Sequence, residues 1–297
     1  MQQAADAGAW PLPRAPLLFR FRDQEWTLGG KTLLLGIVNV TPDSFSDGGE
    51  FLVVEAALEH GEKLVAAGAA MLDVGGESTR PGAAPVSAEA ELERVLPVIR
   101  GLRQRVALPI SIDTSKAAVA KAAIAAGAVV INDISGLHRD PDMMAVLRET
   151  GAGCVLMHMR GTPATMQQFT HYTDLTGEIR AYFRDTLRAA AVAGVPEERF
   201  LLDPGIGFSK TAEQNLVLIR DLWRFRQLGR PVLAGPSRKS FIGKLLPPGV
   251  SVRERVWGTA GAVAACALCG ADIIRVHDVA EMAQLLVVAD AVRNVAG

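Results

Sequence analysis

From residue 33 onward the chain repeats one pattern: a short apolar run ends in a polar or glycine-rich turn, and an Ala- and Leu-rich stretch follows. Runs that are apolar at almost every position are typical of strands buried on both faces, as in a parallel sheet covered by helices. We expect eight strands. The runs are LLLGIV before Asn39, AMLDV around Asp73, PISI before Asp113, VVI before Asn132, CVLM before His158, FLL before Asp203, PVLA before Gly235 and DIIRV around Arg275.

Each run is followed by a stretch that is competent to form a helix. Eight βα units in one chain are typical of an α/β fold of the (β/α)8 or TIM-barrel type. A doubly wound sheet is the competing fold, but it usually carries GxGxxG or GxxxxGK[ST], and neither pattern occurs here. The barrel is therefore favoured. The expected helices are Val53–Ala67, Ala88–Gln104, Lys116–Ala126, Asp142–Thr150, Leu175–Ala193, Glu213–Leu228, Arg253–Leu268 and Val279–Val292.

The N-terminal segment departs from this pattern. Residues 1–16 contain three prolines among Ala and Gly, which predicts a loose lead-in. The next two runs, Leu17–Arg22 and Glu25–Leu28, predict a short β-hairpin joined through Asp23-Gln24. Residues 17–297 are then expected to form a single barrel domain.

Composition narrows the class of protein. Of the 297 residues, 49% are hydrophobic and 21% charged, and the net charge of −1 gives no electrostatic case for nucleic acid or a membrane as partner. Three cysteines are too few for a disulfide framework, and the CxxC at Cys266 and Cys269 lies in a small apolar run that predicts a packed helix face. No secretory signal and no stretch of ~20 apolar residues is visible, so we expect a soluble cytoplasmic protein.

Polar residues stand at the carboxyl end of all eight predicted strands, where TIM barrels place their active sites. Any one of them could simply cap the next helix or form a turn. Eight of eight ends favour a cup lined with polar groups. The residues are Asn39, Asp73, Asp113, Asn132, Asp133, His158, Asp203, Ser237–Ser240, Arg275 and His277.

Two loops at these strand ends, Thr41–Glu50 and Gly75–Pro85, exceed the usual ~2–6 residues of a βα loop. Both are rich in Gly, Pro, Ser and Thr. Ordinary surface variation would explain their length, but Phe45 within such a polar loop is better explained if it packs on a bound ligand. We therefore expect mobile loops that cover a ligand.

An anion site is predicted at the end of the barrel sequence. GPSRKS (235–240) ends a strand and opens a helix, so backbone N–H groups, two serine hydroxyls and Lys239 can face a carboxylate or phosphate. Arg275 and His277, two residues apart after the last strand, point to one side of it. Arg80 can close over the same anion. Together, Arg80, Arg275 and His277 form a cluster that suits a pyrophosphate leaving group. The carboxylates of Asp113 and Asp203 and the amide of Asn132 suit a flat heterocycle that bears N–H donors.

Taken in order, the motifs resemble those of the dihydropteroate synthase family, from about residue 33 to the C-terminus. The match covers seven of the eight strand ends together with the loop of His158. Pro236 and Ser209 stand at less standard positions. The motifs are NVTPDSFSDGG (39–49), DVGGESTRPGA (73–83), SIDT (111–114), INDISG (131–136), MHMRGTP (157–163), DPGIGF (203–208), SRKSFIG (237–243) and RVHDV (275–279).

This resemblance implies a transferase of folate biosynthesis that condenses 6-hydroxymethyl-7,8-dihydropterin diphosphate with 4-aminobenzoate to 7,8-dihydropteroate and diphosphate. It also implies Mg²⁺, sulfonamides as competitors of aminobenzoate, and a homodimer, for which the small-residue helix around Gly258–Gly270 offers a close-packing face. Departure of diphosphate leaves positive charge on the pterin methylene, so the site must stabilise both separating charges. No general base is obligatory for a neutral arylamine.

The family's residue roles carry over as expectations. Catalysis is assigned to Asp47, Asp113, Lys239, Arg275 and His277. Pterin binding is assigned to Asp113, Asn132, Asp203, which grips the N–H edge, and Lys239. Diphosphate binding is assigned to Asn39, Arg80, Arg275 and His277, with Asn39 also a Mg²⁺ ligand. The aminobenzoate pocket is assigned to Phe45, Thr79, Pro81, Phe208 and Ser240.

Two other functions remain open from the sequence. A methyltetrahydrofolate:corrinoid methyltransferase would share Asp113, Asn132 and Asp203, but it would have no need of STRPGA or of SRKS with Arg-x-His. A non-catalytic homologue that binds a pterin-like ligand without turnover is the second alternative. Every catalytic position that can be mapped is filled, which argues against that alternative.

Overall fold

The computed structural model describes residues 14–41, 50–80 and 82–295. Its centre is a parallel sheet of eight strands in the order β8-β7-β6-β5-β4-β3-β10-β9. A parallel bridge between Leu202 and Val232 joins the two ends of this order, which confirms the predicted barrel. The strands are β3 (Leu33–Asn39), β4 (Met71–Gly75), β5 (Ile110–Asp113), β6 (Val130–Asp133), β7 (Gly153–Met157), β8 (Phe200–Asp203), β9 (Leu233–Ala234) and β10 (Ile273–Val276).

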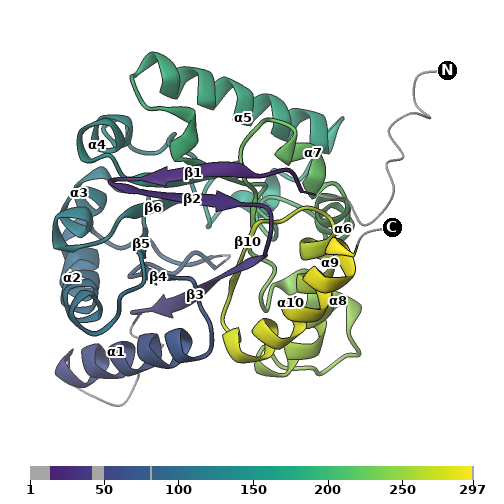
Figure 1. Cartoon of the computed structure of the whole chain (residues 1–297), viewed down its shortest axis with the longest axis horizontal. Coiled ribbons are helices and arrows are strands. Elements are labelled where there is room, and N and C mark those ends of the chain that lie inside the picture. The colour runs from purple at the N-terminus through teal and green to yellow at the C-terminus, as the bar shows by residue number, and fades with distance from the viewer. Residues whose placement is uncertain (1–13, 42–49, 81, 296–297) are drawn as a thin grey trace.

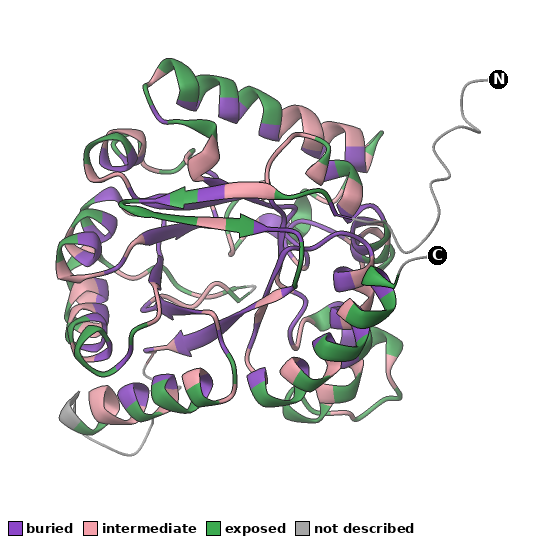
Figure 2. Cartoon of the chain, in the orientation of Figure 1, coloured by how far each residue is buried: buried purple, intermediate pink, exposed green. Residues whose placement is uncertain are grey.

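Helices surround the strands and bury their inner faces against them (Figures 1 and 2). The α-helices are α1 (Glu50–Ala66), α2 (Ala88–Arg105), α3 (Ala117–Ala126), α4 (Met143–Thr150), α5 (Leu175–Val192), α6 (Ala212–Arg220), α7 (Leu222–Arg226), α8 (Ser240–Leu245), α9 (Val256–Leu268) and α10 (Val279–Asn294). The 3₁₀ turns within the described residues are η2 (Met166–Gln168), η3 (Glu197–Arg199) and η4 (Arg253–Arg255). In the described part of the chain, no helix has both the length and the apolar character that crossing a membrane requires.

Two of the predicted helices differ from the observed ones. The helix expected over 213–228 is divided at Asp221, whose carboxylate accepts a hydrogen bond from the Thr176 hydroxyl at 3.0 Å. The helix expected to begin at Arg253 begins with η4, and α9 proper starts at Val256. A contact with another helix accompanies the first change, and a 3₁₀ turn replaces the first turn of the second helix.

The N-terminal hairpin, β1 (Leu17–Phe21) with β2 (Gln24–Leu28), closes the amino end of the barrel. Phe19 and Phe21 are fully buried and pack with the first inward-facing side chain of most barrel strands, such as Met71 and Val130. The turn falls one residue earlier than predicted because Arg22 adopts a φ of 54° and its N–H bonds Gly151. This apolar plug leaves the opposite end of the barrel for polar groups.

The last part of the expected lead-in is not loose. Arg14 is buried, bonds the Ala271 carbonyl and the Thr32 hydroxyl, and lies 3.7 Å from the Asp272 carboxylate. Burial lowers the pKa of Arg14 to about 10. Residues 1–13 lie outside the described residues, so the prediction is corrected only for the segment beginning at Arg14.

Candidate functional site

Strand geometry produces a polar layer inside the barrel. Side chains two residues apart on a strand share a face. On four strands, the side chain that packs with the hairpin is apolar, and the side chain two residues further along the same strand is polar. Asp73 follows Met71, Asn132 follows Val130, Asp203 follows Leu201 and Arg275 follows Ile273. The sequence-predicted cup is thus the second layer of the barrel interior.

Arg275 lies between two carboxylates. Its Nε is 2.6 Å from Asp73 Oδ2 and its Nη2 is 2.8 Å from Asp113 Oδ2. Burial acts to lower the pKa of Arg275, but the charges of Asp73 and Asp113 outweigh it and raise that pKa. Burial raises the pKa of Asp113 to about 7 despite the Arg275 charge beside it. Arg275 and Asp113, which were expected to bind diphosphate and pterin, therefore contact each other directly.

Asp203, Phe208 and Lys239 form a second cluster of predicted residues. Asp203 Oδ1 accepts a hydrogen bond from Gly205 N–H at 2.8 Å, and burial raises the pKa of this carboxyl. Lys239 Nζ stands 3.9 Å over the Phe208 ring. Burial and the Arg275 charge lower the pKa of Lys239 to about 8. The cluster offers one carboxylate oxygen and a cation beside an aromatic face.

His277 is neutral at neutral pH. Burial, followed by the Arg275 charge, lowers its pKa to about 3. The Ser237 hydroxyl accepts the His277 backbone N–H at 3.2 Å and lies 2.9 Å from Nδ1. In the tautomer in which the Ser237 hydroxyl donates to Nδ1, the imidazole proton is on Nε2. His277 can donate a hydrogen bond to an anion without carrying a charge.

The helix that was predicted to bind an anion at its N-terminus, after GPSRKS (235–240), is shorter than expected. Helix α8 has six residues, and Ser240, its first residue, is exposed. Arg238, in the same segment, donates from Nε to Asp278 at 3.0 Å. The cations of Lys239 and Arg275, rather than the short helix, provide the positive charge at this end of the barrel.

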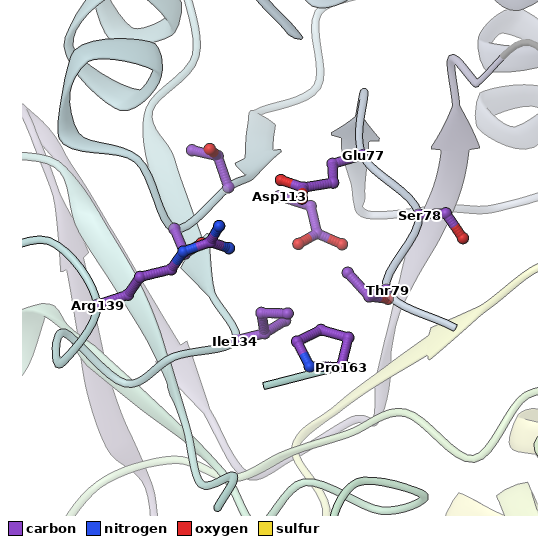
Figure 3. A pocket seen from close by; sticks show the side chains of 9 residues that line it. Glu77, Ser78, Thr79, Asp113, Ile134, Arg139 and Pro163 are labelled. Atoms are coloured by element: carbon purple, nitrogen blue, oxygen red, sulfur yellow. The ribbon is translucent and has the colours of Figure 1, made fainter. Parts of the chain in front are cut away.

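The loop after β4 is held by a half-buried ionic contact. Lys116 Nζ lies 2.5 Å from a carboxylate oxygen of both Glu77 and Glu91, and Glu77 also accepts the Val86 N–H at 3.2 Å. Figure 3 shows Glu77, Ser78 and Thr79 on one side of a pocket, facing Arg139 and Ile134, with Asp113 between them. The residues that line this pocket are Glu77, Ser78, Thr79, Asp113, Thr114, Ser115, Ile134, Arg139 and Pro163.

The remaining predicted residues lie at the edge of the site or beyond the described part of the chain. Asn39 is half-buried at the end of β3. Arg80 is exposed, and its charge contributes to the lowered pKa of His277. The structure does not describe Phe45, Asp47 and Pro81, which fall in 42–49 and at 81.

Sequence reasoning missed a buried lysine. Lys210 Nζ lies 3.1 Å from His158 Nδ1 and 3.2 Å from the His158 carbonyl oxygen. Burial lowers the pKa of Lys210 to about 7, and burial together with Lys210 lowers that of His158 to about 2. Ser209, before it, has a φ of 48° and accepts the Arg160 N–H at 3.0 Å. A lysine in a glycine-rich loop looks exposed in sequence, and no pattern there signals its burial.

A metal centre built by protein ligands alone is not found among the described residues, because no three His, Cys, Asp or Glu side chains gather to hold an ion. Mg²⁺ commonly keeps several waters and binds through one or two protein oxygens plus substrate phosphates. The single side-chain carbonyl of Asn39, on the strand that pairs with the strand of Arg275, fits that mode. It does not fit a structural metal.

The comparisons with known proteins agree with this geometry. The model of the family described as "Pterin binding enzyme" matches residues 35–277. The dihydropteroate synthase of Synechocystis sp. is 50% identical over 291 residues, 98% of each chain. The Xanthomonas albilineans dihydropteroate synthase with 4-aminobenzoic acid has a TM-score of 0.86 and 44% identity over 94% of this chain and 100% of its own. The same enzyme in complex with 7,8-dihydropteroate gives 0.83 and 42% over 93% and 100%.

These matches decide between the functions left open by the sequence. The 50% identity to a dihydropteroate synthase over 98% of both chains argues against the corrinoid methyltransferase hypothesis, because shared pterin contacts alone would not extend across the whole chain. The match to the family model also covers the strand ends that carry the polar layer. The chain belongs to the dihydropteroate synthase family of pterin-binding enzymes.

Proposed function

We propose that the polar layer at the carboxyl end of the barrel performs the reaction of this family. The chain is a dihydropteroate synthase: it condenses 6-hydroxymethyl-7,8-dihydropterin diphosphate with 4-aminobenzoate and releases diphosphate. The observation that supports this placement is the contact of Arg275 with Asp113, in the layer that also holds Asn132 and Asp203. Cationic and carboxylate groups lie side by side there, as separating charges require.

The pterin is assigned to the carboxylate and amide side of the layer. The Gly205 N–H donates a hydrogen bond to Asp203 Oδ1, so Oδ2 is the oxygen assigned to accept from the N–H edge of the pterin. Asn132 donates its Nδ2 to Asp73 at 3.0 Å, which leaves Oδ1 as a further acceptor. Lys239 lies against Phe208 and closes this side with a positive charge. Donors on the flat heterocycle thus meet acceptors held in fixed orientations.

The diphosphate is assigned to Arg275, His277 and Arg80. A guanidinium binds phosphate oxygens by paired N–H donors, and the neutral His277 adds one donor from Nε2. Asn39 would hold Mg²⁺ with the diphosphate and water. When bound, the ion neutralises charge on the leaving group. Removal of Mg²⁺ is therefore expected to slow turnover.

In the reaction, the C–O bond between the pterin methylene and the diphosphate breaks, and both electrons leave with the diphosphate. Carboxylates of the layer stabilise the cation that remains, while Arg275 and His277 stabilise the anion. The aminobenzoate nitrogen attacks the methylene and then loses a proton to water. Its pocket is assigned to Phe208, Thr79 and Ser240 together with residues outside the described part of the chain.

We also propose a homodimer formed through α9 and α10, which pack against each other. Large apolar side chains are exposed on these helices: Trp257 is 81% exposed, Val287 72% and Val288 64%. An exposed apolar patch of this kind marks an interaction surface. Gly258 does not serve this purpose, because it already packs against Ile242 within the chain. Gly261, also on α9, is exposed and has open space beside it, so the proposed partner surface combines the exposed valines of α10 with the small-residue face of α9 first expected.

The catalytic proposal is tested by product formation. Purified protein with both substrates and Mg²⁺ should form 7,8-dihydropteroate, detected by chromatography and mass, and should form none when aminobenzoate is omitted. Excess EDTA should lower the rate, and added Mg²⁺ should restore it. A protein that binds pterin and forms no product would contradict the proposed reaction; turnover unaffected by EDTA would contradict only the metal.

A further inference from the structure

Asp73 is the most connected buried carboxylate of the barrel layer, and no role in the reaction has so far been given to it. Its side chain is 0% exposed. Asp73 Oδ2 accepts from Arg275 Nε at 2.6 Å and from Asn132 Nδ2 at 3.0 Å, and Oδ1 accepts from the Ser111 hydroxyl. Three strands, β5, β6 and β10, therefore meet at one carboxylate on β4.

These contacts determine what the two neighbouring groups present to a ligand. An asparagine amide can be turned by 180° with little change in shape. An ionised carboxylate can only accept hydrogen bonds. Asn132 must therefore direct Nδ2 toward Asp73, which leaves Oδ1 for the substrate. Arg275 is held through Nε, which leaves its Nη groups for other partners. A carboxylate at this position thus fixes an acceptor on one side and a cationic fork on the other.

Arg275 has a second contact, to a residue that is assigned to the substrate. Nη2 donates to Asp113 at 2.8 Å, and Asp113 is itself assigned to the pterin. When the pterin takes Asp113, Nη2 loses that partner while Nε keeps its contact with the fully buried Asp73. Asp73 then serves as the fixed point about which the guanidinium turns toward the diphosphate.

We propose that Asp73 is a positioning residue that couples the pterin and diphosphate subsites: it orients the Asn132 amide as an acceptor and anchors Arg275 through Nε while Nη2 passes from Asp113 to the diphosphate. The inference rests on the proposed function, because it acts through Asn132 and Arg275. A structural account is also available, in which Asp73 only stabilises the fold of the barrel layer. The two accounts differ in whether the effect of Asp73 depends on its partners.

Double-mutant cycles separate these accounts. Titration calorimetry would measure the affinity of Mg²⁺–diphosphate for the wild type, Asp73→Asn, Arg275→Ala and the double variant. We expect Asp73→Asn to weaken diphosphate binding about fivefold or more in the wild type, and by less than about twofold when Arg275 is already alanine. The same pattern is expected for 6-hydroxymethylpterin with Asn132→Ala in place of Arg275→Ala. Equal losses in both backgrounds would overturn the proposal.

Further variants keep the test decisive. Ser111→Ala leaves the contacts of Asp73 with Asn132 and Arg275, so both affinities should stay within about twofold of the wild type; a loss as large as that of Asp73→Asn would show a general disturbance and overturn the proposal. If Asp73→Asn does not fold by circular dichroism, Arg275→Lys is the substitute. A lysine keeps the charge but has no Nε that stays on Asp73 while a second nitrogen turns to the diphosphate, so weaker diphosphate binding is expected, and unchanged binding would overturn the proposal.

Failure of the proposed function has a different signature. If Arg275→Ala binds Mg²⁺–diphosphate as well as the wild type does, the assignment of Arg275 to the leaving group is wrong, and the role of Asp73 falls with it. If Arg275→Ala weakens binding and Asp73→Asn does not, only the role of Asp73 is wrong.

Discussion

Replacement of Asp203 by asparagine should weaken pterin binding, because the structure fixes how the new amide must lie. Gly205 N–H donates to Oδ1 of Asp203 at 2.8 Å, and the side chain is only 6% exposed. An asparagine must give its oxygen to Gly205 and direct Nδ2 at the pterin, where it meets N–H donors. The variant therefore loses a charge-assisted hydrogen bond, worth about 1.5–3 kcal/mol, and we expect about 10- to 150-fold weaker binding.

The assay is calorimetric titration of 6-hydroxymethylpterin into both proteins at constant pH. Asp133→Asn is the matched control, because Asp133 is also a buried carboxylate at the end of a barrel strand. Its hydrogen bonds are local, from Ser135 N–H at 2.8 Å and Leu137 N–H at 3.0 Å, so this change should lower stability and leave pterin affinity within about twofold. Unchanged affinity in Asp203→Asn would show that Asp203 only holds the turn to Gly205 and would refute the reasoning.

Three further predictions concern pH, order of binding and assembly. Because burial raises the pKa of Asp113 to about 7, the folded state binds the Asp113 proton more tightly than the unfolded state does. The contribution of Asp113 to the free energy of unfolding should therefore fall as the pH rises from about 4 to about 7. In urea titrations, Asp113→Asn should gain more stability relative to the wild type at pH 8 than at pH 5. The sequence predicts that the loops Thr41–Glu50 and Gly75–Pro85 close over a ligand. If that closed state is about 1% populated in the free enzyme, Mg²⁺–diphosphate should tighten aminobenzoate binding up to about 100-fold. Equal dissociation constants with and without Mg²⁺–diphosphate would indicate a preformed pocket. Light scattering should give twice the 31.5 kDa chain mass, reduced by Val288→Asp and not by Val192→Asp, because Val192 is also an exposed valine but lies on α5; a monomeric wild type would contradict the dimer.

The fold follows from the sequence because its main signal is short range. Fully apolar runs such as CVLM and FLL become β7 and β8, and the residue after each run reaches the carboxyl end of the barrel. The division of the helix at Asp221 is not visible in the same way, because its partner Thr176 lies on another helix, 45 residues away. Local composition predicts elements well and contacts between distant elements poorly.

The candidate site shows the same limit. Arg275, Asp113 and Asn132 were found individually from their places after strands, and the structure brings them together. Their common partner Asp73 was noted only as one more polar strand end, since a carboxylate in mid-strand gives no sign of how many donors it accepts. Lys210 was missed altogether, because burial of a lysine beside His158 depends on how two loops pack.

A crystal structure of the protein with the non-reacting pair 6-hydroxymethylpterin and Mg²⁺–diphosphate tests the central claim most directly. The account predicts the pterin ring within the barrel layer with its N–H edge on Asp203 Oδ2, and the diphosphate on Arg275 and His277, with Arg275 still bound to Asp73 and separated from Asp113. A pterin bound elsewhere, with the contact between Arg275 and Asp113 intact, would contradict it.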